Sequence, residues 1–359
     1  MRYGILGCGM MGQEHIRNIH LIAGSRVTAI VDPDAAMRAR ALALSPGTVV
    51  VDTLARMVAR DDVDAIVIAT PNHQHLAQLE EVAAIRPMPV LLEKPVYTKA
   101  SELPRLMRLR DNFPSLIWVA LEYRYMPPIT KFLEMLGAET GEPTMLTIRE
   151  HRFPFLKKVG DWNRFNGNTG GTMVEKCCHF FDLMRLAIGA EPVRVMASAG
   201  QAMNHLDEIY GGAVPDIWDH GYVLVEFANG ARAALELCMF AEGSRYQEEL
   251  SAVGPGGKLE ALVPGPGRFW PAHLGPAPVA RVIASPRHPR GPRSLEIPVD
   301  PQLLKAGDHN GATYYEHVLF QRAIRTGGAP AVSLDDGVAA VRMGLAAQEA
   351  ARDRRVVSL

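Results

Sequence analysis

One candidate for proton transfer is a lysine that directly follows a run of apolar residues. Lys94 stands in the segment Glu93-Lys94-Pro95, immediately after Val90–Leu92. Most lysines lie on solvated faces, so a lysine just beyond a buried strand is unusual. In a partly dry cleft its amine is suited to accepting and donating protons, and we predict that Lys94 is catalytic. The alternative is a salt-bridged lysine with only a structural role.

A second candidate group lies where charged side chains interrupt a later apolar stretch. Residues 172–188 are predicted to form one helix, and Lys176 lies within it. At about 100° per residue, this helix places Glu175, His179 and Asp182 within about 60° of one another. Such a stripe is costly on a buried helix unless its members are paired or face a wet cleft. We therefore predict that His179 is a catalytic acid–base group with Glu175 beside it; the alternative is a histidine satisfied within the core.

A glycine-rich turn near the start of the chain has the pattern of a dinucleotide-binding fingerprint. Gly7-Cys8-Gly9-Met10-Met11-Gly12 follows an apolar strand and opens a helix, whose N-terminal N–H groups suit a pyrophosphate. Asp32 ends the next predicted strand, where a carboxylate accepts hydrogen bonds from ribose hydroxyls and repels a 2′-phosphate. Since Pro33 follows it, where NADP enzymes more often have Ser, Thr or Arg, NAD is predicted in preference to NADP. The turn residues predicted to contact the cofactor are Gly7, Gly9, Met10, Met11 and Gly12.

Two more polar motifs are predicted at the same edge of the sheet. The segment 69–75 and the segment 93–95 each follow an apolar strand, and open α/β sheets bind their ligands at the carboxyl ends of their strands. A strand end followed by a helix cap would give the first motif without any ligand. The cofactor contacts predicted from these motifs are Thr70, Pro71, Asn72, His75, Glu93 and Lys94.

These groups are distributed over a regular alternation of strands and helices. Apolar, β-rich runs between Tyr3 and Ala120 alternate with helical stretches, which is typical of a parallel sheet with helices on both faces. The sequence therefore predicts an α/β fold whose residues 1–122 form a doubly wound, Rossmann-type domain that binds NAD.

The second part of the chain has a different pattern of predicted elements. Met145–His151 and several strand candidates between Val193 and Val263 follow one another, with turns such as Asn229-Gly230 between them. Residues 123–359 are thus predicted to form an α+β substrate domain with a large, mostly antiparallel open sheet. An open face of that size is expected to be covered by a further copy, in a homodimer or homotetramer. The Pro-, Gly- and Arg-rich stretch Pro264–Arg293 is predicted to be an irregular surface loop, or else a lid or subunit-contact arm.

The overall composition excludes several classes of partner. A formal net charge of −1 argues against nucleic acid or an anionic membrane. No apolar run reaches the about 18 residues of a membrane span, and no leader peptide is recognised after Met1, so a cytoplasmic protein is expected. The four cysteines have no framework spacing and are expected to be reduced. No metal is expected at Cys177-Cys178-His179, because consecutive helical side chains diverge.

Together these motifs resemble the Gfo/Idh/MocA family, named for glucose–fructose oxidoreductase, inositol 2-dehydrogenase and a rhizopine-catabolism protein. The resemblance runs the length of the chain. It includes the glycine turn with His15 and Asn18, the motif 70–75, Glu93-Lys94-Pro95, Glu122-Tyr123-Arg124-Tyr125 before Pro127, and Asp335-Asp336-Gly337. The resemblance adds Glu122 to the predicted cofactor contacts.

The resemblance implies oxidation of a ring hydroxyl of a sugar, a sugar derivative or an inositol by a nicotinamide cofactor. It implies that Lys94 and His179 flank that hydroxyl and exchange its proton as hydride leaves the carbon. Glu175 stands where many members have Asp. The same family contains NAD-dependent glycosidases and reductases of keto-sugars and imines, which stay open as alternatives, as does a cofactor-sensing scaffold.

Polar and aromatic side chains in and around the segment Gly160–Gly171 are candidates for binding sugar hydroxyls through guanidinium forks and ring stacking. Loop packing and turn capping would explain several of them equally well. The predicted substrate contacts are Arg152, Trp162, Asn163, Arg164, Lys176, His309 and Tyr314.

Overall fold

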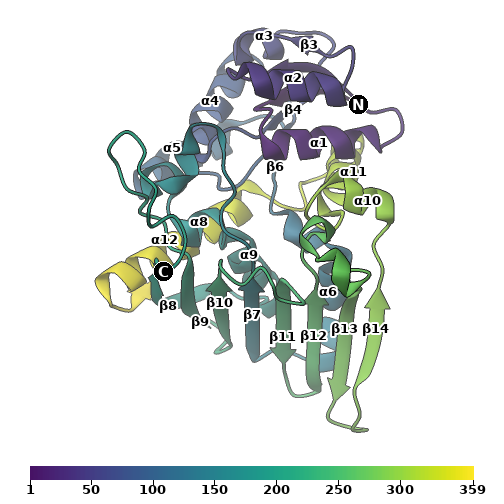
Figure 1. Ribbon diagram of the computed structural model, residues 1–359, viewed down its shortest axis with the longest axis vertical. Coiled ribbons are helices and arrows are strands. Elements are labelled where there is room, and N and C mark those ends of the chain that lie inside the picture. Colours follow the sequence, from purple (N-terminus) through teal and green to yellow (C-terminus); the bar gives the residue numbers. More distant parts are fainter. The chain divides into compact units, whose positions relative to one another are not determined.

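A computed structural model describes all 359 residues, and the chain divides into two compact units. The first unit is built mainly from the N-terminal part of the chain and takes in two later segments (Figure 1). Its segments are Met1–Glu122, Lys157–Gly170 and Thr313–Val341. The segments of the second unit are Tyr123–Leu156, Gly171–Ala312 and Arg342–Leu359.

The first unit contains a six-stranded sheet in the order β3-β2-β1-β4-β5-β6, in which every pair is parallel. This confirms the predicted doubly wound sheet. β4 and β5 are buried along their whole length, as strands covered on both faces should be. The strands are β1 (Arg2–Leu6), β2 (Arg26–Val31), β3 (Val49–Val50), β4 (Ala65–Ile68), β5 (Val90–Leu92) and β6 (Ile117–Val119). The helices are α1 (Met10–His20), α2 (Ala35–Leu44), α3 (Leu54–Val58), η1 (Asn72–Gln74), α4 (His75–Ile85), η2 (Ala100–Glu102), α5 (Leu103–Asn112), η4 (Val159–Arg164), α7 (Asn166–Thr169) and α11 (Ala312–Thr326).

The second unit contains a nine-stranded sheet in the order β14-β13-β12-β11-β7-β10-β9-β8-β15. Only the central pair β7–β10 is parallel, so the sheet is mixed and mostly antiparallel. The strands are β7 (Met145–His151), β8 (Pro192–Gly200), β9 (His220–Phe227), β10 (Arg232–Cys238), β11 (Glu248–Val253), β12 (Gly257–Val263), β13 (Ala280–Pro286), β14 (Arg293–Ile297) and β15 (Val357–Ser358). The helices are η3 (Glu122–Tyr125), α6 (Pro127–Thr140), α8 (Thr172–Glu175), α9 (Cys178–Ile188), η5 (Gly267–Phe269), η6 (Ala272–Leu274), α10 (Pro301–Ala306) and the end of α12 (Leu334–Asp353).

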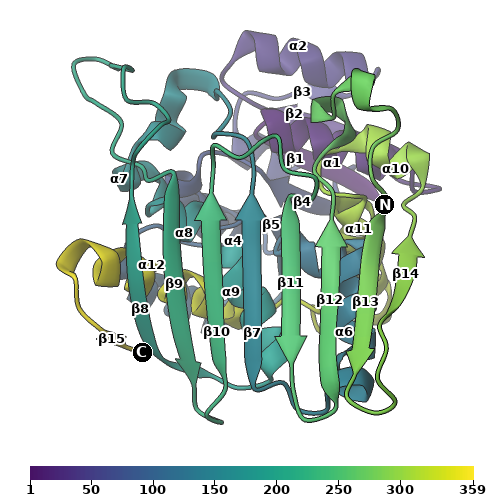
Figure 2. The same cartoon turned by 60° about the horizontal axis from the view of Figure 1, so that its bottom comes forward.

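The large sheet has one covered and one open face. α6 and α9 lie behind the strands in Figure 2, and the other face is turned to the viewer. The alternation along β7 explains the difference, since Leu146 and Ile148 are buried while Met145 and Thr147 are exposed. The predicted open sheet is therefore confirmed, and the predicted homodimer or homotetramer stays a prediction. None of the helices combines the length and apolar character needed to cross a membrane.

Two predictions about this unit are wrong. The helix expected over 172–188 is interrupted after Glu175, and α9 starts only at Cys178. Asp182 pairs with Arg124. The stretch 264–293 is also not irregular throughout, because Ala280–Pro286 forms β13 against β12. Its alternating burial, with Val282 inside, follows from packing on the covered face.

Candidate functional site

The glycine turn in the first unit is shaped by close backbone contacts. Gly7 has φ +90°, and a Cβ there would lie 2.6 Å from the carbonyl oxygen of Ala69. A Cβ on Gly12 would lie 2.0 Å from the carbonyl oxygen of Gly7. At Gly9 the added Cβ would meet no atom within 4 Å, and no side chain caps α1 there. The space beside Gly9, at the N-terminus of α1, therefore suits the close approach of a pyrophosphate.

Asp32 lies beside this turn with its carboxylate held by backbone donors. Its Oδ2 accepts from the N–H of Cys8 at 2.6 Å, and its Oδ1 accepts from the N–H of Asp34 at 2.8 Å. The Arg38 guanidinium donates to the carbonyl oxygen of Asp32 at 2.8 Å. Burial, followed by the charge of Asp32, raises the pKa of the Cys8 thiol to about 12. Cys8 therefore stays a neutral thiol, and the turn keeps a carboxylate where a ribose is expected.

His75 braces two of the motifs at the carboxyl edge of the first sheet. Its buried ring lies between the carbonyl oxygen of Pro95, 2.8 Å from Nδ1, and that of Thr70, 2.9 Å from Nε2. Burial lowers the pKa of His75, which keeps the ring neutral. The brace fixes the loop after β4 against the loop that carries Lys94, so both predicted motifs are held at the same edge.

A chain of buried histidines supports the carboxylate next to Lys94. Glu93 Oε1 lies 3.0 Å from His15 Nε2, and His15 Nδ1 lies 3.0 Å from His317 Nε2. Burial alone would raise the pKa of Glu93, but the His15 hydrogen bond and the charge of Lys94 outweigh it, so the pKa is lowered. Burial, followed by His15, lowers the pKa of His317 well below its usual value. A pair of buried histidines therefore holds an ionised carboxylate directly before Lys94.

α11 supplies further buried polar groups to the first unit. Thr313 Oγ1 lies 2.5 Å from Glu122 Oε2 and 3.1 Å from Glu14 Oε1. Trp118 Nε1 donates to Glu316 at 3.2 Å. Burial, followed by the charge of Glu122, raises the pKa of Glu316 well above its usual value. Glu316 and the neighbouring His317 did not stand out in the sequence, because the helical pattern shows which residues are buried but not which distant carboxylate they meet.

Four predicted substrate contacts also belong to the first unit. The Trp162 ring lies edge-on to His73 at 6.4 Å between centroids, and the Lys158 ammonium lies 4.5 Å from the Trp162 ring. Asn163 and Arg164 are buried, and Tyr314 packs edge-on against its neighbour in α11. Their roles toward a substrate stay predictions.

His179 in the second unit lies against a tyrosine that the sequence pattern did not assign to a role. The rings of Tyr123 and His179 are stacked, 4.1 Å between centroids and 12° between planes. Tyr123 also lies 6.0 Å from the ring of His309. The buried ion pair of Arg124 with Asp182 ties the turn that carries Tyr123 to α9, which carries His179. This ion pair therefore holds together the two elements that carry the stacked rings.

Lys176, a predicted substrate contact, is directed into the core of the second unit. It is 5 % exposed, and its ammonium lies 2.8 Å from Glu150 Oε1 and 2.5 Å from the Tyr123 hydroxyl. Arg152, another predicted substrate contact, lies 3.5 Å from the same Glu150 oxygen. Glu150 was missed, although its place in β7 carries a signal: it shares the parity of the buried Ile148.

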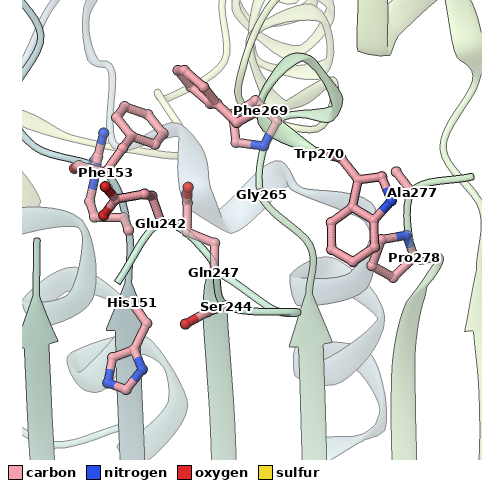
Figure 3. Close-up of a pocket in the computed structure, with 12 residues that line it drawn as sticks. His151, Phe153, Glu242, Ser244, Gln247, Gly265, Phe269, Trp270, Ala277 and Pro278 are labelled. Carbon is pink, nitrogen blue, oxygen red and sulfur yellow. Dashed lines mark hydrogen bonds between the residues drawn. The ribbon is translucent and has the colours of Figure 1, made fainter. Parts of the chain in front are cut away.

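A small pocket of about 30 Å³, partly open to solvent, lies between the end of β7 and the segment after β12 (Figure 3). Its wall includes three aromatic rings, those of Phe153, Phe269 and Trp270, together with Arg152 and Gln247. The Arg152 guanidinium lies 4.3 Å from the centre of the Phe153 ring. Part of the stretch that was expected to be irregular thus lines the same hollow as a predicted substrate contact.

The chain was compared with known families and proteins. Residues 1–120 match the profile of an oxidoreductase family, NAD-binding Rossmann fold, and residues 134–359 match that family's C-terminal alpha/beta domain. The chain belongs to the Gfo/Idh/MocA family. It is thus an oxidoreductase with an N-terminal NAD-binding domain, as the motifs predicted.

Several members of the Gfo/Idh/MocA family are similar along most of the chain. Inositol 2-dehydrogenase 2 of Saccharopolyspora erythraea is 28% identical over 271 residues, which cover 74% of this chain and 74% of that protein. Levoglucosan dehydrogenase, solved with NADH and levoglucosan, has a TM-score of 0.81 and 18% identity, covering 100% of this chain and 99% of that one. A myo-inositol dehydrogenase from Corynebacterium glutamicum has a TM-score of 0.76 and 21% identity, covering 100% and 98%. These two structures show likeness of fold.

Proposed function

We propose that this member of the Gfo/Idh/MocA family is an NAD-dependent dehydrogenase that oxidises a ring hydroxyl of a sugar, a sugar derivative or an inositol. Family membership supports the oxidoreductase activity. The names of its relatives support the substrate class, since inositol 2-dehydrogenases and levoglucosan dehydrogenase act on cyclic polyols or sugar derivatives.

The first unit offers the groups that NAD requires. The open space beside Gly9 at the start of α1 suits the pyrophosphate, and the Asp32 carboxylate suits the ribose hydroxyls. When bound, the cofactor accepts the hydride that leaves the substrate carbon. Asp32 favours NAD, because a 2′-phosphate would meet its negative charge. The further contacts that we propose are Gly7, Met10, Met11, Gly12, Thr70, Pro71, Asn72, His75, Glu93, Lys94 and Glu122.

Lys94 and His179 are proposed to move the proton of the substrate hydroxyl. The strongest support is that each stands on a buried polar network within its own unit. Lys94 follows Glu93, whose carboxylate accepts a hydrogen bond from His15 and has a lowered pKa. The His179 ring stacks on Tyr123, whose hydroxyl is bound to a buried ammonium. Glu175, buried one turn before His179, is proposed to orient the imidazole or a neighbouring substrate hydroxyl.

The aromatic pocket is proposed to bind the part of the substrate that lies away from the reacting carbon. Phe269 and Trp270 offer faces for the apolar side of a sugar ring, and Arg152 offers donors for its hydroxyls or for a carboxylate. The remaining substrate contacts that we propose are Trp162, Asn163, Arg164, His309 and Tyr314.

The test is to incubate the purified protein with NAD⁺ or NADP⁺ and a panel of inositols, hexoses, uronates and anhydrosugars, and to record the absorbance of NADH. The proposal expects NADH from one substrate class, and more with NAD⁺ than with NADP⁺. A panel of aryl glycosides is run beside it. Release of the aryl group without net NADH would contradict the dehydrogenase and favour a glycosidase.

A further inference from the structure

Two carboxylates lie opposite each other inside the second unit. Glu150 of β7 and Glu248 of β11 are direct cross-strand partners, and both are 0 % exposed. They occupy positions whose neighbours along each strand, Ile148 and Leu250, belong to the core. Like charges directly opposite destabilise a sheet, and buried charges are costly without partners. Such a pair needs a compensating charge or a retained proton.

The hydrogen bonds and ion pairs of these two carboxylates leave part of each without a partner. The Lys176 ammonium contacts Glu150 Oε1 at 2.8 Å, and Gln247 donates to Glu248 Oε1 at 2.6 Å. The Oε2 atoms of Glu150 and Glu248 are both buried and have no hydrogen-bond partner. The two cations nearby, Lys176 and Arg152, both contact Glu150 Oε1, at 2.8 Å and 3.5 Å. Glu248 forms no ion pair, and its burial together with the charge of Glu150 favours its protonated form.

Lys176 also contacts Tyr123, one of the two rings in the Tyr123–His179 stack. Its ammonium lies 2.5 Å from the Tyr123 hydroxyl, and the Tyr123 ring stacks on His179. Contacts thus run without a break from Glu150 through Lys176 and Tyr123 to the imidazole. Every member of this chain belongs to the second unit.

We propose that Lys176 is a positioning residue: held by Glu150, it fixes Tyr123 and so the plane of His179, and the protonation of the Glu150–Glu248 pair controls how firmly it does so. The catalytic significance of this arrangement rests on the proposed function of His179, whereas the arrangement itself does not. Lys176 then acts through Tyr123 and does not bind the substrate.

The pair is expected to change its charge close to neutral pH. Burial, followed by the charge of Glu150, raises the pKa of Glu248 to about 7. Below that pH, Glu248 is neutral and Lys176 is shared between one carboxylate and Tyr123. Above it, a second negative charge draws the ammonium away from the hydroxyl. The groups that face Glu248 are Glu150 and Arg152 from β7 and its end, Lys176 from the helix side, the neighbouring Gln247, and the apolar Val263 from β12.

The first experiment needs no substrate. Ring-labelled tyrosines are followed by NMR from pH 5.5 to 8.5, and the signal of Tyr123 is assigned with Tyr123→Phe. Because a phenol with its ordinary pKa of about 10 does not titrate in this range, a transition near pH 7 reports a neighbour. The proposal expects this transition in the wild type and its loss in Glu248→Gln. A Tyr123 signal that does not change with pH, or a transition that survives Glu248→Gln, would overturn it.

A second labelling, of the histidines, tests whether the lysine acts on His179. Lys176→Met should move the His179 ring signal, whereas the control Lys131→Met should not, because Lys131 is a surface residue of α6 that pairs with Glu134. An unmoved His179 signal in folded Lys176→Met would contradict the positioning role. If Lys176→Met does not fold, Tyr123→Phe replaces it, since this variant keeps the ring stack and removes the contact with the ammonium.

Kinetics then connect the arrangement to turnover. Lys176→Met is expected to lower kcat by about 10²-fold through misplacement of the imidazole, with little change in the KM for NAD⁺. Lys176→Arg, which keeps the charge, should recover part of the loss, and Glu248→Gln should remove a transition near pH 7 from the pH profile. An unchanged kcat in Lys176→Met would contradict the inference. If the wild type oxidises no polyol, the proposed function fails, and the tyrosine and histidine signals still decide whether Lys176 positions His179.

Discussion

The two units each support a candidate acid–base side chain with a buried polar network, and the networks differ in charge. In the first unit, one carboxylate, Glu93, receives a hydrogen bond from His15, which is backed by His317. In the second unit, two carboxylates face each other across neighbouring strands, and a single buried ammonium lies within contact distance of one of them.

This difference separates a carboxylate that stays ionised from one that titrates near neutral pH. The pKa of Glu93 is lowered and that of His317 lies well below its usual value, so neither group changes its charge near neutral pH. The pKa of Glu248 is raised to about 7. A buried carboxylate whose pKa is lowered by its hydrogen-bond donor stays ionised near neutral pH, whereas a facing pair of acids makes the arrangement around them depend on pH.

The largest effect is expected from the side chain that the first network supports. Lys94→Ala should lower kcat by about 10²–10⁴-fold, because it removes a positioned proton donor and acceptor. NADH binding, followed by fluorescence, should weaken far less than turnover, because the other proposed cofactor contacts remain. Lys99→Ala, at an exposed position nearby, is the control. Unchanged activity in Lys94→Ala would contradict the proposal that the buried network around Glu93 supports a catalytic lysine.

The next effect concerns the stability of the first network. His15→Leu leaves Glu93 Oε1 buried without its donor and should reduce the free energy of unfolding by about 3 kcal/mol. Because Glu93 and His317 keep their charge near neutral pH, urea unfolding at pH 6 and at pH 8 should give a similar loss. His20→Leu, an exposed histidine of the same helix, serves as the control. A loss of unfolding free energy that differs strongly between pH 6 and pH 8 would contradict the difference between the two networks.

The second network should show the opposite behaviour. The pKa of Glu248 in the folded protein, about 7, lies above its ordinary value of 4.5, so the folded chain binds this proton more tightly than the unfolded chain. Stability from this group is therefore greatest at low pH and is lost as the pH rises toward 7. Between pH 5.5 and 8.5, the wild type should lose about 2 kcal/mol more than Glu248→Gln. Parallel unfolding curves for the two proteins across this range would contradict the titrating pair.

The smallest effect is expected at a carboxylate that is not part of either network. Asp32 is held by backbone N–H groups alone, so its charge is directed to the space beside the glycine turn. Asp32→Ala should weaken NADH binding by about tenfold, or about 1.4 kcal/mol, and should improve NADPH binding. Asp52→Ala, an exposed aspartate, is the control. Equal loss for both cofactors would show that Asp32 does not discriminate between them.

Much of the fold could be predicted from local patterns. The strands of the first unit are short, apolar and regularly spaced, so burial on both faces determines their composition. β7 was predicted at its observed bounds, because alternating burial marks a sheet with one covered face. β13 was missed because proline, glycine and arginine surround a strand whose partner, β12, is the feature that stabilises it. The break after Glu175 was missed because the apolar pattern continues through it.

The candidate site was predictable where its residues lie in one motif. Glu93-Lys94-Pro95 and the glycine turn carry their signal in consecutive residues. His317 and Glu248 could not be predicted as parts of these networks, because their partners are distant in the chain and only folding brings them together. Lys176 was predicted to contact the substrate, but its direction depends on the position of Glu150 in β7. Residue type and spacing thus indicate which groups are unusual, and the fold decides what they contact.

The most direct test of the account is NADH formation with NAD⁺ across the panel of inositols, hexoses, uronates and anhydrosugars, by the wild type, Lys94→Ala and His179→Gln side by side. We predict NADH with at least one cyclic polyol or sugar for the wild type, and a loss of about 10²-fold or more in each variant, with NADH binding retained in both. Full turnover in either variant would contradict the account that each unit supplies one acid–base group to the reaction.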